Sequence, residues 1–323
     1  MNKTEYFLEN NSVTRAKETM KKLVNRPDSE KIEFLKEIHN RGETPAEITG
    51  FAMALREMAD IQVKYPGLTD IVGTGGDGKN TVNVSTAVSI LLASMRIKTA
   101  KHGNFGITGH HGSADFMEYI NYNFKMSENE IVDKLNQKNY VYILAPQYNK
   151  SFAKFAQARK ELSFRTVFNI LGPLTNPLNP DKVVLGTYSD SLAGLYAKVI
   201  LQEHKKGFIV HSSDGMDELS PYGENHLYFI NGKIEKMNID PKKLTGHRTE
   251  IEKISTVNSE KSFKMLLAGL SGENRYVKEF IALNAFPAIL INGMAHTAEE
   301  AYDLAIKYID SGMAVKKLRE VCE

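Results

Sequence analysis

The sequence has almost no cysteine and no long apolar run. Its one cysteine is Cys322 in a chain of 323 residues, which excludes a disulfide framework and a cysteine-based metal site. No run of about eighteen apolar residues occurs, so no membrane span is predicted. The first residues, MNKTEYFLENNSV, lack the apolar segment of a secretory signal. We therefore expect a soluble, cytoplasmic protein with no membrane partner.

The sequence also lacks an excess of either charge. It has 41 lysine and arginine residues against 39 aspartate and glutamate residues, which gives a formal net charge of +2. Proteins that bind nucleic acid usually carry a clear basic surplus, so this balance disfavours a nucleic-acid partner. The length and the 42% of hydrophobic residues are enough for a large core and two domains.

The N-terminal part, residues 1–66, has the apolar spacing of helices. The clearest signal is at residues 44–59, where Thr44 is a suitable N-cap, Pro45 suits the first helical position and Glu47 completes a capping box. An apolar stripe then follows at helical spacing, formed by Ile48, Phe51, Ala52, Leu55, Met58 and Ala59. We predict a small helical domain over 1–66, joined by helices near 150–176.

The remaining residues, 67–323, predict a large α/β domain with a mainly parallel sheet covered by helices. Short β-rich runs at 69–72, 98–102, 140–145, 182–188 and 207–212 alternate with helical stretches at 87–95, 127–137 and 191–203. Such alternation is typical of a parallel sheet with helices on both faces. Residues 227–239 predict a hairpin around Asn231 and Gly232, and the chain reads as helical again from about 258, with Thr297 opening the last long helix.

Four glycines, Gly73, Gly75, Gly76 and Gly78, crowd together directly after the first predicted strand. They match the dinucleotide pattern G-x-G-x-x-G, but no acidic residue occurs between Gly78 and Asp115, where that fingerprint needs one. Residues 73–79 also approach a P-loop, but the next residue is Asn80 instead of a serine or threonine. Both interpretations are therefore disfavoured.

A different anion site explains the loop better. The segment from 79 to 114 contains no acid, and a second glycine-rich turn follows at 103–112. Two backbone-rich loops at neighbouring strand ends suit a ligand with more than one phosphate, although two exposed turns remain an alternative. The basic residues of this segment are Lys79, Arg96, Lys98, Lys101, His102, His110 and His111.

Two adjacent carboxylates, Asp217 and Glu218, follow the strand predicted at 207–212. Most exposed acids of this kind only form a solvated loop. The functional alternative is a magnesium site, since Mg²⁺ takes few oxygen ligands from protein and completes its shell with phosphate and water.

Taken in order, the motifs DIVGTGGDG, NVST, KHGN, GSAD, RTVFNILGPLTNP and GMDE resemble those of the anthranilate phosphoribosyltransferases. The resemblance extends from the helix at 44–59 to AIKYIDSGMAVKKL near the end. It implies a homodimeric enzyme of tryptophan biosynthesis. Its reaction joins phosphoribosyl pyrophosphate (PRPP) and anthranilate to give phosphoribosyl anthranilate and pyrophosphate.

The resemblance also implies site residues. Ser85, Asp217 and Glu218 match magnesium positions, Gly73, Asn104 and Arg159 match anthranilate positions, and His102 is the candidate catalytic residue. Only the motif match selects Arg159 over its neighbours Lys160 and Arg165. The positions implied to bind PRPP are Gly73, Gly76, Asp77, Thr81, Asn83, Ser85, Thr86, Lys101, Gly103 and Ser113.

The sequence departs from the family pattern at two places. Phe105 stands where an arginine is common, and His110-His111 stands where Lys-Ser is common, which affects the expected contacts to pyrophosphate. Alternative functions are a nucleoside phosphorylase-like enzyme, a phosphoribosyltransferase for another aromatic amine, and a non-catalytic nucleic-acid-binding relative. The intact Asn104, Arg159 and magnesium positions disfavour the last.

Overall fold

The computed structural model of the chain describes residues 12–106 and 112–322. Its N-terminal part is helical, as the sequence predicts: α1 spans Val13–Leu23, α2 Asp28–Arg41 and α3 Pro45–Glu57. The capping box of α3 is confirmed, because the Glu47 N–H donates to the Thr44 hydroxyl over 3.3 Å and the Thr44 N–H donates to the Glu47 carboxylate over 3.0 Å. The buried side of α3 packs against α1.

A seven-stranded sheet forms the centre of the larger part of the chain. Its strands lie in the order β3-β2-β1-β4-β5-β6-β7. The first five are mutually parallel, whereas β6 and β7 form the predicted antiparallel hairpin, with Gly232 at φ +70° in its turn. The strands span Thr69–Gly73 (β1), Thr99–Gly103 (β2), Tyr140–Leu144 (β3), Lys182–Gly186 (β4), Lys206–Ser212 (β5), Asn225–Ile230 (β6) and Ile234–Ile239 (β7).

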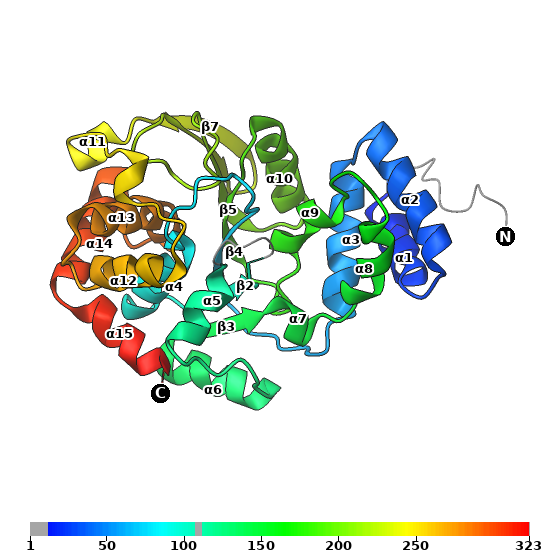
Figure 1. Cartoon of the computed structure of the whole chain (residues 1–323), viewed down its shortest axis with the longest axis horizontal. Coiled ribbons are helices and arrows are strands. Elements are labelled where there is room, and N and C mark those ends of the chain that lie inside the picture. The colour runs from blue at the N-terminus through cyan, green and yellow to red at the C-terminus, as the bar shows by residue number, and fades with distance from the viewer. Residues whose placement is uncertain (1–11, 107–111, 323) are drawn as a thin grey trace.

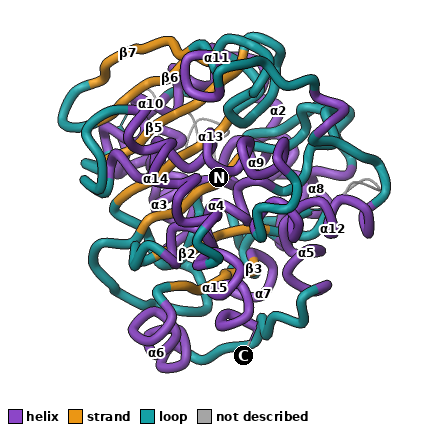
Figure 2. Tube along the Cα trace, turned by 90° about the vertical axis from the view of Figure 1, so that its left-hand side faces the viewer, coloured by secondary structure: helices purple, strands orange, loops and turns teal. Residues whose placement is uncertain are grey.

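Helices cover both faces of the sheet, which confirms the predicted fold class (Figures 1 and 2). Along β4 the side chains alternate: Val184 joins the apolar core beneath one set of helices, while Val183 and Leu185 join the core beneath the other. The first set comprises α4 (Val84–Ser94), α12 (Ser259–Leu270), α13 (Arg275–Ile291), α14 (Ala298–Asp310) and α15 (Met313–Cys322). The second comprises α10 (Asp190–Gln202) together with the N-terminal helices, α8 (Ala156–Lys160) and α9 (Phe168–Leu171).

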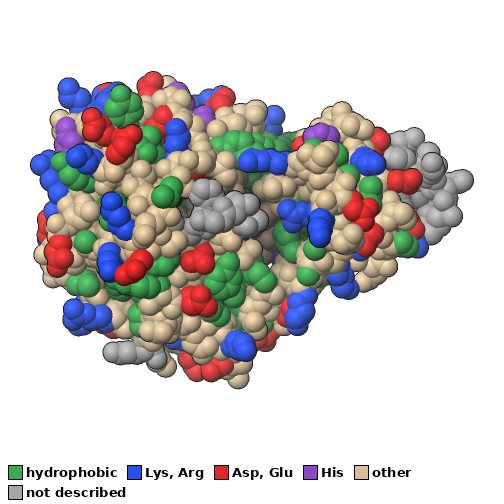
Figure 3. Space-filling view, viewed as in Figure 1, with side chains coloured by type: hydrophobic (Ala, Val, Ile, Leu, Met, Phe, Trp, Pro, Cys, Tyr) green, Lys and Arg blue, Asp and Glu red, His purple; other side chains and the backbone are tan. Residues whose placement is uncertain are grey.

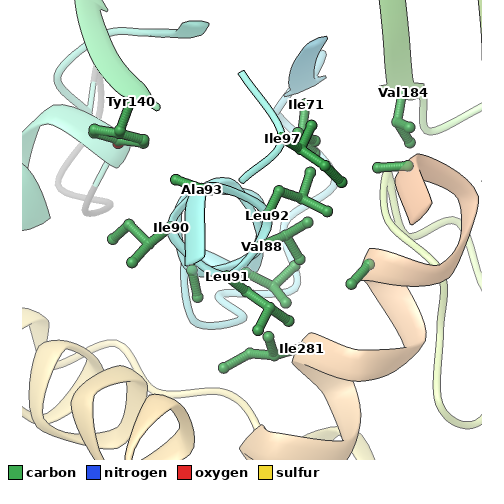
Figure 4. Packing of buried hydrophobic residues seen from close by; sticks show 14 of the residues in the cluster. Ile71, Val88, Ile90, Leu91, Leu92, Ala93, Ile97, Tyr140, Val184 and Ile281 are labelled. Atoms are coloured by element: carbon green, nitrogen blue, oxygen red, sulfur yellow. The ribbon is translucent and has the colours of Figure 1, made fainter. Parts of the chain in front are cut away.

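Helix α4 is buried on nearly every side. Its residues Val88, Leu91 and Leu92 lie among Ile71 of β1 and Ile281 of α13, with Ala93 and Ile90 turned toward Tyr140 (Figure 4). A helix that is apolar all round belongs inside a protein. Because α4 begins directly after the loop that follows β1, this packing fixes the position of the loop and of the first turn of the helix.

The segment 145–176 connects the sheet to the N-terminal helices, and α8 packs on α2 while α9 packs on α3 (Figure 1). The last long amphipathic helix was predicted to open at Thr297, and α14 does so, with the Glu300 N–H donating to the Thr297 hydroxyl over 3.1 Å. It is not the last helix, because the chain turns at Gly312 (φ +75°) and α15 follows. The remaining elements of the described residues are α5 (Ser113–Tyr119), α6 (Glu128–Lys138), α7 (Ala145–Tyr148), α11 (Lys242–Thr245) and the short 3₁₀ turns Ala153–Phe155, Gly172–Leu174 and Ile251–Lys253.

Within residues 12–106 and 112–322, no helix has both the length and the apolar character needed to cross a bilayer.

Candidate active site

A cavity of about 700 Å³ opens at the carboxyl ends of β1, β2 and β4. This is the edge of a parallel α/β sheet at which ligands usually bind. Figure 3 shows a recess between the large α/β part and the helical part, with lysine and arginine side chains along its helical side. The cavity is lined by residues 71–78, 80–85, 101–106, Gly112, Ser113, Arg165, Asn169, Val184, Gly186, Tyr188, Asp217, Glu218 and Asn284.

The glycine loop after β1 forms one wall of the cavity. Gly75, Gly76 and Gly78 have φ values of +65°, +78° and +73°, a region in which side chains with a Cβ are strained. The Thr74 N–H donates to the Gly186 carbonyl over 3.0 Å, and the Gly75 N–H donates to Asp217 Oδ2 over 2.6 Å. The loop is therefore tied to β4 and to the acidic pair that follows β5.

The predicted acidic pair lies in this cavity. The Asp217 carbonyl oxygen lies only 1.6 Å from where a Cβ on Gly186 would stand, so the close approach requires glycine at the end of β4. The Thr81 hydroxyl donates to Glu218 Oε2 over 3.2 Å. Burial, with the nearby charge of Asp77, raises the pKa of Asp217 to about 7, and burial together with Asp217 raises the pKa of Glu218 well above its usual value.

These carboxylates fit a divalent cation. Like charges of Asp77, Asp217 and Glu218 face one another, and the buried Oδ2 of Asp77 has no hydrogen-bond partner. A cation here would offset the repulsion that, after burial, contributes to the raised pKa values of Asp217 and Glu218. Among the described residues, however, no group of three or more histidine, cysteine or acidic side chains forms a complete metal site. A bound cation would thus need further oxygen ligands from a substrate or water. Mg²⁺ is usually coordinated in this way.

A buried polar network lies beneath the cavity at the start of β1; it joins the predicted site residues Lys101 and His102 to Asp70 and Asn176, which the sequence did not single out. Asp70 accepts the backbone N–H of His102 over 3.1 Å and an Asn176 side-chain N–H over 2.9 Å. Lys101 Nζ donates to the His102 carbonyl over 2.7 Å. Burial raises the pKa of Asp70 and lowers that of Lys101, while their mutual attraction acts against both shifts. A charged residue within the apolar run TDIV is the only sequence signal that could have identified Asp70.

His102 lines the cavity but is a weak base. Burial, together with the neighbouring charge of Lys101, lowers its pKa to about 3. Its Nε2 is buried without a hydrogen-bond partner. The imidazole is therefore neutral near neutral pH.

The first turn of α4, residues 103–106 and the residues Gly112 and Ser113 also line the cavity. Asn83 Nδ2 donates to the Gly112 carbonyl over 3.0 Å, and the hydroxyls of Ser113 and Tyr142 share a hydrogen bond of 2.7 Å. Ser85 lines the cavity beside Asn83. Thr86 does not line it, since its side chain is fully buried and its hydroxyl has no partner. The pair His110-His111 lies outside the described residues.

The two arginines of the connecting segment occupy different places. Arg159, on α8, is half-buried with its guanidinium 5.6 Å from the Phe168 ring centroid, and it does not line the cavity. Arg165, which the sequence analysis set aside, does line it. Asn104 also lines the cavity, with its Oδ1 accepting the Phe105 N–H over 2.8 Å. The structure thus brings Gly73 and Asn104 to one cavity but leaves Arg159 beside it.

The chain is similar to known proteins over most of its length. Residues 65–315 match the family described as "Glycosyl transferase family, a/b domain". The chain is 51% identical over 316 residues to the anthranilate phosphoribosyltransferase of Picrophilus torridus, covering 98% of this chain and 97% of that protein. The chain belongs to the anthranilate phosphoribosyltransferase family. The enzyme of that name from Thermoplasma acidophilum is 39% identical over 281 residues, covering 87% of this chain and 86% of its own.

Solved structures of the family share the fold. The anthranilate phosphoribosyltransferase of Thermus thermophilus superposes with a TM-score of 0.92 at 30% identity, over 99% of this chain and 97% of that one. The Saccharomyces cerevisiae enzyme in complex with PRPP and Mg superposes with a TM-score of 0.85 at 26% identity, over 96% of this chain and 92% of that one. The same yeast enzyme in complex with 4-fluoroanthranilate gives a TM-score of 0.83 at 25% identity, over the same shares of the two chains.

Proposed function

We propose that this chain is an anthranilate phosphoribosyltransferase, which transfers the phosphoribosyl group of PRPP to the amine of anthranilate and releases pyrophosphate, in tryptophan biosynthesis. The observation that carries the proposal is a single cavity in which a glycine loop faces a pair of buried carboxylates. Backbone N–H groups suit phosphate, and carboxylates suit the cation that accompanies it.

In this proposal the sheet side of the cavity binds PRPP. The loop residues Gly73 and Gly76 offer close backbone approach, and Asp77 accepts from ribose hydroxyls. Lys101 is the buried cation of the site, held by the His102 carbonyl. The remaining residues assigned to PRPP are Thr81, Asn83, Ser85, Gly103 and Ser113, all of which line the cavity. Thr86 would act through the first turn of α4, because its side chain is buried.

We assign Asp217, Glu218 and Ser85 to Mg²⁺, in line with the yeast relative solved with PRPP and Mg. The donor set fits, since two of these groups are carboxylates whose pKa values are raised by burial and by neighbouring negative charge. When bound, the ion neutralises charge on the leaving pyrophosphate. The Gly75 N–H orients Asp217 and the Thr81 hydroxyl orients Glu218, so both acids are held for this task before a ligand arrives.

The acceptor side of the proposal uses Gly73, Asn104 and Arg159. Arg159 lies outside the cavity, so its contact with the anthranilate carboxylate requires α8 to move toward the sheet. Closure of a lobe over bound substrates is a common way to complete a site. We therefore propose a small helical domain over 1–66 with the helices near 150–176, which closes on the larger domain at 67–323.

The chemistry needs little acid–base help from the chain. An aromatic amine is neutral near neutral pH and attacks without prior deprotonation, so alignment and charge stabilisation are the main demands. His102, with its pKa lowered to about 3, is a poor proton acceptor, and its place in the cavity lining suits a positioning role instead. A homodimeric state and a cytoplasmic location complete the proposal and rest on the family resemblance.

The test is a fluorescence assay. Anthranilate fluorescence should fall when the protein, PRPP and Mg²⁺ are all present, and should stay constant when any one is omitted. The second candidate, a nucleoside phosphorylase-like reaction, predicts cleavage of nucleosides with inorganic phosphate in the absence of magnesium. Buried Asp217 and Glu218 disfavour it, because two carboxylates without a cation would repel phosphate.

A further inference from the structure

The charged side chains that line the cavity are unequally available to a ligand. Among the described residues they are the acids Asp77, Asp217 and Glu218 and the cations Lys101 and Arg165. Lys101 is 2% exposed, its ammonium donates to the His102 carbonyl, and its charge also faces Asp70 and Glu218. Within the described part of the chain, Arg165 is thus the exposed cation at the cavity.

Arg165 is held at the mouth of the cavity by contacts on both sides. Its guanidinium carbon lies 5.0 Å from the centroid of the Tyr188 ring, two residues beyond β4. Its Nη2 lies 3.2 Å from the position that a Cβ on Gly76 would occupy. The guanidinium therefore lies between an aromatic side chain and the glycine loop, an arrangement in which cation–π attraction fixes the plane of the group.

The backbone around Arg165 is also fixed. The next residue, Thr166, donates its N–H to Asn169 Oδ1 over 3.0 Å. The preceding residue, Phe164, stacks on His39 of α2 with ring centroids 3.8 Å apart and an interplanar angle of 17°. The backbone at Arg165 is thus held between α2 of the helical part and the strand ends of the sheet.

No carboxylate of the described residues forms an ion pair with Arg165, so its charge is available to an anion. A guanidinium presents a planar fork that matches phosphate with two hydrogen bonds. On the loop that Arg165 contacts, the neighbouring Gly75 N–H binds Asp217. The guanidinium and the acid assigned to magnesium therefore flank the same loop, which is the end of the cavity where a metal-bound diphosphate would lie.

We propose that Arg165 binds the diphosphate group of PRPP and stays bound to the pyrophosphate that leaves. This inference rests on the proposed function and adds a residue that the motif match did not select. The guanidinium offsets the negative charge that accumulates as the bond from the anomeric carbon to the diphosphate oxygen breaks and the electron pair passes to pyrophosphate. Tyr188 is a positioning residue in this scheme, since it acts only through the guanidinium.

The test separates the parts of the substrate by calorimetric titration. Pyrophosphate with Mg²⁺ and ribose 5-phosphate are titrated separately into the wild type, Arg165→Gln and Arg165→Lys, with Lys160→Gln as the matched control. Lys160 is exposed, lies on the same segment and does not line the cavity. We expect Arg165→Gln to weaken pyrophosphate binding on the order of ten- to a hundredfold, Arg165→Lys to weaken it less, and ribose 5-phosphate affinity to stay unchanged.

Tyr188 provides a second, independent test. Tyr188→Leu should weaken pyrophosphate binding a few-fold, Tyr188→Phe should keep the ring and the affinity, and Tyr188→Leu should have no further effect when Arg165 is already glutamine. An unchanged pyrophosphate affinity in Arg165→Gln would overturn the proposal. So would an equal loss for ribose 5-phosphate, which indicates a folding defect, or a rise in the KM for anthranilate alone, which would assign Arg165 to the acceptor carboxylate.

The calorimetric measurement of pyrophosphate binding does not depend on turnover. A wild type that consumes anthranilate while Arg165→Gln keeps its pyrophosphate affinity refutes only this inference. A wild type that binds pyrophosphate through Arg165 but leaves anthranilate unchanged supports the inference and refutes the proposed acceptor.

Discussion

The two sides of the cavity are built in different ways. On the sheet side, the glycine loop, Lys101 and the pair Asp217 and Glu218 follow or lie in β1, β2 and β5. Hydrogen bonds hold Lys101 to the His102 carbonyl and tie both acids to residues 75 and 81 before any ligand is present. On the helical side, Arg159 and Arg165 lie on the segment between the sheet and the N-terminal helices, and only Arg165 reaches the cavity. A preorganised wall suits PRPP and its metal, and the anchored Arg165 adds to it, whereas a closing movement that brings in Arg159 suits selection of the acceptor.

The largest expected effect lies on the sheet side. Asp217→Asn combined with Glu218→Gln should lower kcat by at least about a hundredfold, because the leaving pyrophosphate loses its counter-ion. The thermal midpoint should not fall. Burial and neighbouring negative charge raise the pKa of both acids, which means that their ionised forms are unfavourable in the fold, and neutral amides avoid that cost. Steady-state rates with Mg²⁺ and a calorimetric melt measure the two quantities. A variant with wild-type kcat would show that the acidic pair is a structural feature of the loop.

The second effect concerns the buried pair beneath the cavity. Lys101→Gln should lower stability by about 3 kcal/mol, because it leaves Asp70 buried without its positive neighbour. Adding Asp70→Asn should restore much of that stability and none of the PRPP affinity. Denaturant unfolding of the wild type, both single variants and the double variant gives the coupling. Additive losses would mean that the two charges do not support each other.

The third effect lies on the helical side. Arg159→Ala should reduce kcat/KM for anthranilate about ten- to a hundredfold, the value of a charge-assisted hydrogen bond to its carboxylate. The KM for PRPP should hardly change. Aniline, which lacks the carboxylate, should be a poor substrate for the parent and insensitive to the substitution. Equal losses for both amines would mean that Arg159 acts through closure of the helical part. The assignment of the helical side to the acceptor would then be wrong.

The smallest effect is a pH dependence. Because the pKa of folded His102 is lowered to about 3, the unfolded chain binds a proton near pH 6.5 that the folded chain does not. The contribution of neutral His102 to stability is therefore complete above pH 6.5 and is lost as pH falls toward 3. Between about pH 7 and pH 5, the wild type should lose about 2 kcal/mol more than His102→Gln. Parallel stability curves for the two proteins would contradict the assignment of a buried, neutral imidazole.

Much of the sheet side could be predicted from the sequence. Alternating strands and helices predict a parallel sheet, and a parallel sheet brings its strand ends to one edge, so the loop at 73–78 and the pair Asp217 and Glu218 are expected at the same edge. The capping box at Thr44 is also local and needs no tertiary information. These features depend on short sequence patterns or on topology.

The remaining features depend on packing that a single sequence does not show. In the sequence, Asp70 is only a charged residue within an apolar strand. Its role in a buried network depends on Asn176, more than a hundred positions away, which donates a hydrogen bond to it. Thr86 belongs to the NVST motif, yet the burial of α4 on all sides removes its hydroxyl from the cavity. Arg159 and Arg165 are equally basic and six positions apart. Only the path of the connecting segment decides which of them faces the ligand.

The most direct test of the central comparison is a crystal structure of the protein with PRPP and Mn²⁺, which replaces Mg²⁺ and can be located by its anomalous scattering. We predict one strong anomalous peak at the carboxylates of Asp217 and Glu218, with the diphosphate along residues 73–78 and Arg165 on its outer oxygens. A metal bound elsewhere, or a diphosphate on the helical side of the cavity, would contradict the assignment of PRPP to the sheet side.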